Sequence, residues 1–202
     1  MAILLTALPL AAARAQSQPA NRLQSRFDAA TYATLKTIID SARKAKLPVK
    51  LIEDNALEGA SSGASGDTIV AAVRQFTKQL VVAQTTLGLA ASAAEMRAAV
   101  GAIDARVPTG DLKRIRRAAP GRPITVALTV LSDIVGRGVP ISTSSDLVVS
   151  LLSHRVKDAD IYTFDRWVRQ DIEKGANPAT AAAARANGFI TAAGGRSDSP
   201  RQ

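Results

Sequence analysis

The densest group of chemically capable side chains in this sequence is a run of cations within ten residues. Such a run is able to dock phosphate, lipid A, anionic lipid or an acidic protein. No aromatic residue is interleaved to stack bases, so we expect no nucleic-acid partner. The simpler interpretation is that these residues end a short helix, where positive charge meets the negative end of the helix dipole. The cations are Lys113, Arg114, Arg116, Arg117 and Arg122.

One serine and one lysine have the spacing of a known nucleophilic motif. Ser41 and Lys44 match S-x-x-K, in which a lysine activates a serine for acyl transfer. That chemistry also needs S-D-N and K-T-G elements. Ile134 stands where the asparagine of S-D-N would be, and the sequence contains no K-T-G. The match therefore predicts no serine hydrolase.

Three aspartates at short spacing raise the question of a calcium site. Asp158, Asp160 and Asp165 are spaced like ligands of a calcium-binding loop. An EF-hand loop needs glycine at its sixth position and a closing glutamate, and here these are Thr163 and Arg169. We therefore interpret the first two aspartates as acids in the first turn of a helix, where negative charge interacts favourably with the positive end of the helix dipole.

Composition removes several other chemistries. The chain has no cysteine, which excludes disulfides, zinc–thiolate sites, iron–sulfur clusters and thiol nucleophiles. Its one histidine, His154, has Asp158 four residues away, which would give only one edge of a metal site, and it is placed to end a helix. We therefore expect no metal and no cofactor.

Carboxylates leave one enzymatic alternative open. Glu53, Asp54, Glu58 and Glu95 could in principle pair for glycoside hydrolysis, which needs two carboxyl groups across a cleft. Only two tyrosines and one tryptophan are present to stack on sugars. The one aromatic concentration, Tyr162, Phe164 and Trp167, is interpreted as core packing.

Helical periodicity dominates the chain from Phe27 onward and predicts an all-α fold. Apolar residues recur at i, i+3, i+4 and i+7 in at least four runs. No stretch shows sustained strand alternation. We expect a helical bundle or a short array of stacked helical hairpins, with about seven or eight helices. The clearest runs are Leu35–Ala42, Ile69–Leu80, Ile124–Val135 and Ile161–Ile172.

Helix starts and ends are marked by specific residues. Proline fits the first turn of a helix, so Pro48, Pro108, Pro140 and Pro178 each predict a helix start. Ser92 and Glu95 form a capping-box pattern. Glycines are placed where a helix end favours a left-handed residue, at Gly136, Gly138 and Gly175.

An internal repeat is a further hypothesis. Pro108 to Pro140 spans 32 residues and Pro140 to Pro178 spans 38, which is the length of one hairpin in stacked-hairpin solenoids. Residues 134–140 and 172–178 share a frame of isoleucine, glycine and proline. Helices of ordinary length joined by short loops give the same spacing, so both interpretations stay open.

One phrase resembles a known group of sequences. Leu47-Pro48 is followed by Ile52 and by the run Ala56 to Ala60 (ALEGA), with Gly63 beyond it. This phrase resembles units of the form "[GK]-[LV]-P…ALEG…G" in uncharacterised exported bacterial helical proteins. Lys46 and Asn55 depart from the glycine and lysine of those units. The resemblance covers about 20 residues and implies a helical, exported protein without a known activity.

The N-terminus predicts export. Residues 2–13 form a short apolar run, and Ala13-Arg14-Ala15 fits the small-x-small cleavage rule, so residues 1–15 are predicted to be a signal peptide. We expect a flexible leader at 16–26, a single helical domain at 27–187 and a disordered tail at 188–202. No later stretch is apolar for the ~20 residues of a membrane helix, so the mature protein should not be transmembrane.

These observations favour a bacterial helical module that is periplasmic or secreted. They favour a scaffold over an enzyme. Net charge is +9, which favours anionic partners and also keeps a protein in solution. The main hypothesis is an exported, non-enzymatic module that binds a protein partner. The alternatives are a cell-wall or glycan hydrolase that uses carboxylates, and a binder of anionic envelope components through the basic cluster.

Overall fold

The computed structural model describes residues 22–197. The predicted signal peptide at 1–15 lies outside the described residues, as do residues 16–21 of the predicted leader and the last five residues of the predicted tail. Residues 22–24, at the end of the predicted leader, are helical.

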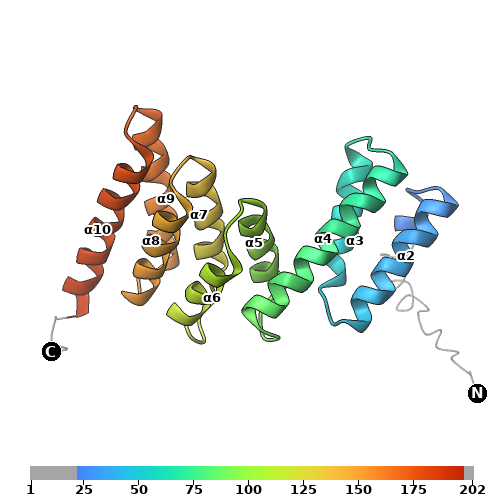
Figure 1. Ribbon diagram of the computed structural model, residues 1–202, viewed down its shortest axis with the longest axis horizontal. Helices are drawn as coiled ribbons and strands as arrows, with labels where there is room; N and C mark the ends of the chain where they lie inside the picture. The colour runs from blue at the N-terminus through green and yellow to red at the C-terminus, as the bar shows by residue number, and fades with distance from the viewer. Residues whose placement is uncertain (1–21, 198–202) are drawn as a thin grey trace, which may run out of the picture. The chain divides into compact units, whose positions relative to one another are not determined.

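The described chain is entirely helical, which confirms the all-α prediction (Figure 1). After the helical residues 22–24, nine further helices lie within residues 29–197, so the predicted count of seven or eight is too low. The shortfall arises because several helices have only 10 to 13 residues, and neighbouring short helices are easily merged in sequence. The bounds are α2 Ala29–Lys44, α3 Val49–Ser61, α4 Gly66–Leu87, α5 Ala93–Asp104, α6 Thr109–Ala118, α7 Thr125–Gly136, α8 Ile141–Ser153, α9 Asp158–Glu173 and α10 Pro178–Ser197.

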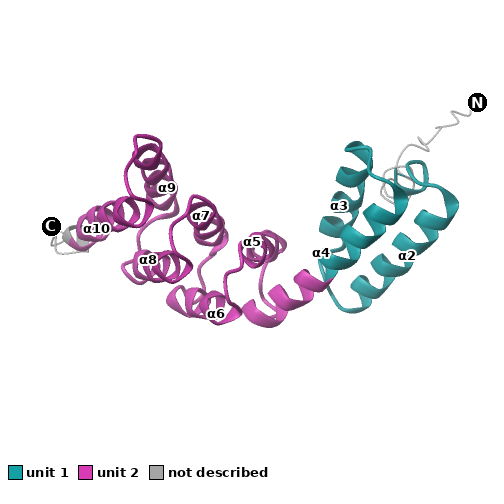
Figure 2. Cartoon of the chain, turned by 45° about the horizontal axis from the view of Figure 1, so that its top comes forward, with its two compact units in different colours: residues 1–77 teal, residues 78–202 magenta. Residues whose placement is uncertain are grey.

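The chain forms two compact units, which corrects the prediction of a single helical domain at 27–187 (Figure 2). Unit 1 ends at Thr77 and unit 2 begins at Lys78. The division falls inside α4, which is one uninterrupted helix of 22 residues. A continuous helical pattern carries no sign of a boundary, and for this reason periodicity alone did not reveal it.

Unit 1 packs α2 against α3 and the first part of α4. Asp28 caps α2, because its carboxylate accepts hydrogen bonds from the backbone N–H groups of Ala30 and Thr31 at 3.0 and 2.9 Å. Gly66 opens α4 directly against Thr31, where a Cβ atom would collide with the threonine hydroxyl. The core of this unit consists of apolar side chains: Leu35, Ile39, Ile52, Ala56, Ile69, Val73 and Phe76.

Unit 2 arranges its helices in two rows. Helix α7 packs against α5 and α9 in one row, and α8 packs against α6 and α10 in the other (Figure 2). Helices α7 and α8 also contact each other, and so do α9 and α10, which joins the rows. The shared core is built from branched aliphatic side chains and one phenylalanine: Leu112, Ile115, Leu128, Leu131, Ile134, Val148, Leu151, Leu152, Ile161, Phe164 and Val168.

Six helix ends share one hydrogen-bonded turn. A residue with positive φ donates its N–H three residues back, and the next residue donates five residues back, which is the Schellman arrangement. Glycine at 138 and 175 was predicted at such ends and is confirmed, whereas Gly136 is an ordinary helical residue. Lysine or arginine takes the left-handed position in three cases. The six residues are Lys46, Gly63, Arg106, Gly138, Arg155 and Gly175.

The predicted helix starts are confirmed at all four prolines. Helices α3, α6 and α8 begin directly after Pro48, Pro108 and Pro140, and α10 begins at Pro178. The segments 134–140 and 172–178, which share a sequence frame, adopt the same turn, with φ of 90° at Gly138 and 93° at Gly175. The shared frame therefore corresponds to a shared way of ending a helix.

Helix α10 corrects the predicted disordered tail. It continues through Ser197, so residues 188–197 are helical. This stretch lacks apolar periodicity and contains three glycines, but it continues the alanine-rich first half of α10, and alanine has the highest helix propensity. Phe189 also anchors it, because its ring packs against Phe164 and Trp167 of α9 at 6.5 and 5.2 Å between centroids. None of the helices within residues 22–197 is both long and apolar enough to cross a membrane.

Candidate functional site

The predicted cation cluster lies on α6 and on the loop that follows it. Lys113, Arg114, Arg116 and Arg117 are on α6, and Arg122 is in the loop at 119–124. Arg116 and Arg117 occupy the last turn of α6, which confirms the prediction that the run ends a short helix. Positive charge at this position interacts favourably with the negative end of the helix dipole.

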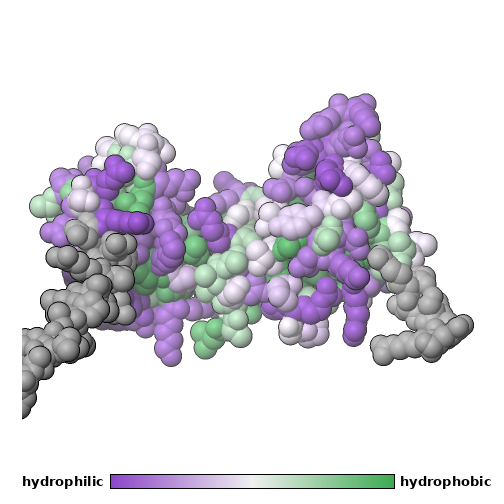
Figure 3. Space-filling model, turned by 180° about the vertical axis from the view of Figure 1, so that it is seen from behind, coloured by the Kyte–Doolittle hydropathy of each residue, from purple (hydrophilic) through white to green (hydrophobic). Residues whose placement is uncertain are grey.

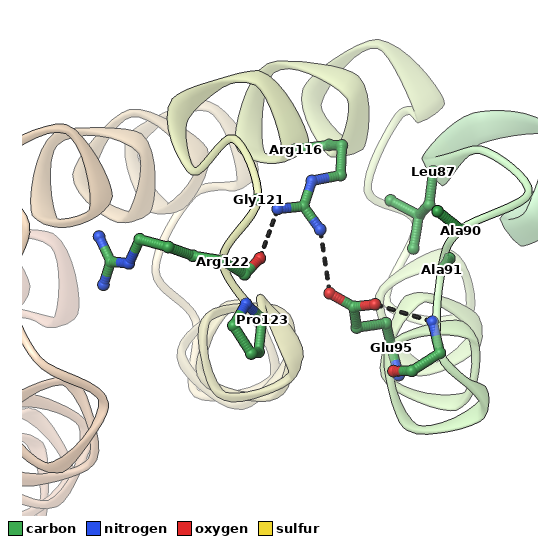
Figure 4. A pocket seen from close by; sticks show the side chains of 9 residues that line it. Leu87, Ala90, Ala91, Glu95, Arg116, Gly121, Arg122 and Pro123 are labelled. Carbon is green, nitrogen blue, oxygen red and sulfur yellow. Dashed lines mark hydrogen bonds and ion pairs between the residues drawn. The ribbon is translucent and has the colours of Figure 1, made fainter.

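Arg116 is held inward by a buried carboxylate (Figure 4). Its Nη1 atom donates to Oε1 of Glu95 at 3.0 Å, and the Glu95 side chain is only 7% exposed. Its Nη2 atom donates to the backbone carbonyls of Ala119 and Arg122. One guanidinium therefore ties the start of α5 to the end of α6 and to the loop beyond it.

Both carboxylate oxygens of Glu95 accept hydrogen bonds. It completes the predicted capping box of α5, since its Oε2 accepts from the N–H of Ser92 at 2.8 Å and the Ser92 hydroxyl accepts from the N–H of Glu95. Its Oε1 also accepts from the N–H of Ile124 at 3.0 Å. Burial opposes ionisation of this carboxyl, but the hydrogen bonds from Ser92 and Ile124 and the Arg116 charge outweigh it and lower the pKa of Glu95.

Two other members of the cluster are engaged with α8. Arg122 donates to the carbonyl oxygens of Leu152, in the last turn of α8, at 3.5 Å and of Val156, in the loop after α8, at 3.2 Å. Arg114 pairs with Asp111 at 3.0 Å and with Asp146 of α8 at 2.7 Å. The cluster thus divides into three arginines used inside unit 2 and two exposed cations, Lys113 and Arg117.

A pocket of about 410 Å³ opens beside Glu95 and Arg116. Leu87, Ala90 and Ala91 form one wall, and Gly121 to Pro123 form the other (Figure 4). The pocket brings the loop after α4 against the loop after α6. Its charged groups already bind each other, so a ligand there would have to compete with the Glu95–Arg116 pair. Glu95, the carboxyl that lines this pocket, is held ionised by three donors and is therefore not poised to exchange a proton with a ligand.

The residues of the serine–lysine and calcium patterns lie in helices and form no site of either kind. Ser41 and Lys44 are exposed on the last turn of α2. Asp158 and Asp160 lie in the first turn of α9, as predicted. His154 follows α8, and its Nδ1 lies 2.9 Å from the Ser150 carbonyl oxygen. Among residues 22–197, no three histidine or carboxylate side chains converge as a metal site would require.

The carboxylates considered for hydrolysis are dispersed. Glu53, Asp54 and Glu58 share α3 in unit 1, where Asp54 pairs with Lys50 at 2.8 Å. Burial raises the pKa of the Glu53 carboxyl. Glu95 belongs to unit 2 and is occupied as described above. A pair of neighbouring carboxylates does occur between α7 and α9, where the sequence predicted none, and one of them raises the pKa of the other.

That pair is Asp165 of α9 beside Asp133 of α7. Burial raises the pKa of Asp165, the Asp133 carboxylate raises it further, and Arg137 and Arg169 offset only part of this. The Oδ1 atom of Asp165 is buried without a hydrogen-bond partner, and so is the Nε atom of Arg137. Sequence reasoning treated Asp165 only as a calcium candidate, because nothing in the spacing of residues 133 and 165 indicates that they meet.

The aromatic residues of α9 have divided roles. Phe164 is fully buried, as predicted for a core residue, but Tyr162 is 53% exposed and Trp167 38% exposed. Trp167 packs on α10, where the guanidinium of Arg185 lies 5.2 Å from its ring centroid. Arg185 also forms a two-point ion pair with Asp171, at 2.6 and 2.8 Å. These contacts fasten the last helix of the unit.

Known proteins give no assignment for this arrangement. No family model matches the chain, and neither a curated protein nor a solved structure resembles it significantly.

Proposed function

We propose that this chain is an exported bacterial helical interaction module without catalytic activity of its own, acting in the periplasm or as a secreted protein. The predicted signal peptide at residues 1–15 supports export. The finer architecture that we propose is a short array of stacked helical hairpins, as in repeat proteins whose extended faces bind partners.

This proposal rests on one observation, which is that the charged side chains of unit 2 are engaged in contacts within the unit. Glu95, Arg116 and Arg122 hold helix ends and loops together, and Arg114 and Arg185 pair with carboxylates of other helices. Groups bound in this way stabilise a scaffold and are not free to transfer protons or attack a substrate. What the unit has left for function is its exposed surface, as expected for a binding module.

Site-specific photo-crosslinking tests the proposal. A photoreactive residue placed at Ala94, Asp133 or Arg166, which are exposed on α5, α7 and α9, should give a discrete covalent adduct in living cells. Lys50, on α3 with a side chain 83% exposed, is the matched position in unit 1. Adducts of one defined mass along the α5–α7–α9 row support a partner-binding face. Absence of any discrete adduct from all positions would overturn the proposal.

An activity measurement covers the hydrolase alternative. The purified chain is incubated with cell-wall glycan, and Asp165→Asn and Glu53→Gln remove the two carboxyls within residues 22–197 whose pKa is raised. We expect no release of glycan fragments from the unsubstituted chain. Release that either substitution abolishes would contradict the non-enzymatic proposal.

A further inference from the structure

Three loops of unit 2 adjoin one another although they are distant in sequence. Residues 88–92 and 119–124 line the same pocket, through Ala90 and Ala91 on one side and Gly121 to Pro123 on the other. Arg122 then reaches the carbonyls of Leu152 and Val156, at the loop 154–157. In Figure 1 the ends of α4, α6 and α8 lie along the lower edge of unit 2. We call the loops 88–92, 119–124 and 154–157 the Leu89 edge.

The other three loops of unit 2 form a second edge. Gln79 near the start of unit 2 donates to Asp104 at the end of α5, so α4 and α5 run in opposite directions. Gly138 lies against Pro178, with a distance of 3.8 Å from an ideal Cβ at residue 138 to the proline ring. Helices α5, α7 and α9 are neighbours in one row, and the loops that follow them, 105–108, 137–140 and 174–177, lie along the upper edge of unit 2 in Figure 1. We call these three loops the Arg106 edge.

The Leu89 edge presents the most exposed large apolar side chain among the described residues. Leu89 is 85% exposed, at the tip of the loop between α4 and α5. Tyr162, one turn into α9, is 53% exposed near the loop 154–157. Figure 3 shows a hydrophobic group at the lower edge, in the region where α4 leads into α5. The large apolar side chains exposed on the described chain include none from the Arg106 edge.

The two edges carry opposite net charge. When the loops are counted with the four flanking residues of each helix, the Leu89 edge has five lysines and arginines against three carboxylates, and the Arg106 edge has three against five. Of the three carboxylates of the Leu89 edge, Glu95 is buried against Arg116. The cations of the Leu89 edge are Arg116, Arg117, Arg122, Arg155 and Lys157, and its carboxylates are Glu95, Asp158 and Asp160.

We propose that the Leu89 edge attaches unit 2 to an anionic phospholipid surface, with Leu89 entering the acyl-chain boundary while Arg117, Arg155 and Lys157 contact headgroup phosphates. An apolar side chain at a loop tip, flanked by basic residues, satisfies both terms of interfacial binding, which are burial of apolar area and attraction to anionic lipid. This inference rests on the proposed export, since it names the partner of an exported interaction module. Membrane attachment of this kind needs no spanning helix.

The apolar contact separates a lipid surface from a soluble polyanion. Polyphosphate attracts the cations of the edge but offers nothing to Leu89. A phospholipid surface engages both, because it buries the leucine as well as neutralising the cations. The exposed leucine makes no demand on folding, so its substitution changes the surface and leaves the helices intact.

Vesicle co-sedimentation of the full mature chain tests the proposal. With phosphatidylglycerol–phosphatidylcholine vesicles, Leu89→Ser should weaken binding by about tenfold, and Arg155→Glu with Lys157→Glu by about thirtyfold or more. Val81→Ser, which changes an apolar residue 45% exposed on the side of α4, is the matched control and should leave binding unchanged. Pure phosphatidylcholine vesicles should bind all of these proteins weakly.

A spectroscopic probe reports insertion directly. Because the chain contains no cysteine, Leu89→Cys and Arg106→Cys each give a single labelling site for a polarity-sensitive fluorophore. The probe at residue 89 should shift to shorter wavelength on phosphatidylglycerol vesicles and not on polyphosphate, and the probe at residue 106 should shift on neither. Equal binding by Leu89→Ser and the unsubstituted chain, or equal responses on vesicles and polyphosphate, would overturn the membrane proposal. Partner crosslinks along α5, α7 and α9 would be unaffected by that failure.

Discussion

The two edges of unit 2 differ in regularity as well as in charge. All three loops of the Arg106 edge use the same Schellman turn, in which a residue with positive φ precedes the next helix by a few positions. On the Leu89 edge only the loop 154–157 does so, and the loops 88–92 and 119–124 have individual conformations. A repeated turn needs nothing but local sequence. An irregular loop has to be held by tertiary contacts, and here Glu95, Arg116 and Arg122 supply them.

Two buried or partly buried carboxylates of unit 2 have opposite environments. Glu95 near the Leu89 edge has all its contacts satisfied and a lowered pKa. Asp165, next to Arg137 of the Arg106 edge, has a raised pKa and an unpartnered oxygen. The difference indicates that the ion pair at the Leu89 edge is part of the framework that holds irregular loops, whereas the charge on Asp165 opposes folding.

The largest expected effect comes from breaking that framework. Glu95→Gln leaves Arg116 without its counter-ion and weakens the capping box, so we expect a loss of about 2–3 kcal/mol in the free energy of unfolding at neutral pH. Denaturant titration measures it. Asp104→Asn, which alters an exposed carboxylate at the Arg106 edge, is the control and should change stability by less than about 0.5 kcal/mol.

The pH dependence of the same variant has a defined sign. Because the pKa of Glu95 is lowered on folding, its ionised form stabilises the protein above the ordinary glutamate pKa, and this contribution is lost as pH falls through the folded-state value. The difference between the unsubstituted chain and Glu95→Gln should therefore shrink towards about pH 3. A difference that stays constant across this range would show that the charge of Glu95 is not responsible.

A smaller loss is expected from removing the link between two loops of the Leu89 edge. Arg122→Ala abolishes the hydrogen bonds to the carbonyls of Leu152 and Val156. We expect a decrease of about 1–2 kcal/mol in unfolding free energy, since these bonds have a charged donor. Hydrogen exchange should accelerate at residues 154–157 in this variant, and unchanged exchange there would contradict the assigned link.

The opposite sign is expected at Asp165. Its pKa is raised on folding, so the protonated form stabilises the protein at low pH, and this contribution is lost as pH rises through the folded-state value. Asp165→Asn removes the ionisation and should raise the unfolding free energy at neutral pH relative to the unsubstituted chain. Thermal unfolding at about pH 3 and pH 7 measures the change. Destabilisation at neutral pH would mean that the carboxylate has a favourable partner.

The features that were predictable from sequence are those set by neighbouring residues. The capping box at Ser92, the four prolines at helix starts and the acids in the first turn of α9 all act within one turn of helix. Amphipathic periodicity fixed the fold class for the same reason. The short length of α6 and its neighbours hid the number of helices, and the glycines at 188, 194 and 195 hid the length of α10.

The candidate site was predictable only in part, because its contacts span long separations. Arg116 and Arg117 were recognisable as last-turn cations, but the pairing of Arg116 with Glu95 joins residues 21 positions apart, and Arg122 reaches 30 and 34 positions along the chain. No local pattern indicates that the loop of Leu89 lies beside that of Arg122. Left-handed lysine and arginine residues were also missed, because this conformation normally marks glycine.

Two of those left-handed arginines give the most direct test of the contrast between the edges. Arg155 on the Leu89 edge and Arg106 on the Arg106 edge have φ of 55° and 65°, each after a helix and before a buried valine. Arg155→Gly and Arg106→Gly remove the same charge and relieve the same backbone strain. Both should therefore raise the free energy of unfolding by about 0.5 kcal/mol.

The decisive measurement is the binding of these two variants to phosphatidylglycerol vesicles at low ionic strength. We expect Arg155→Gly to bind about fivefold more weakly than the unsubstituted chain and Arg106→Gly to bind equally well. That result would show that the Leu89 edge binds the vesicle and the Arg106 edge does not, and neither variant would have lost stability. Equal weakening by both variants, or none by Arg155→Gly, would contradict the assignment of the Leu89 edge as the surface that binds anionic lipid.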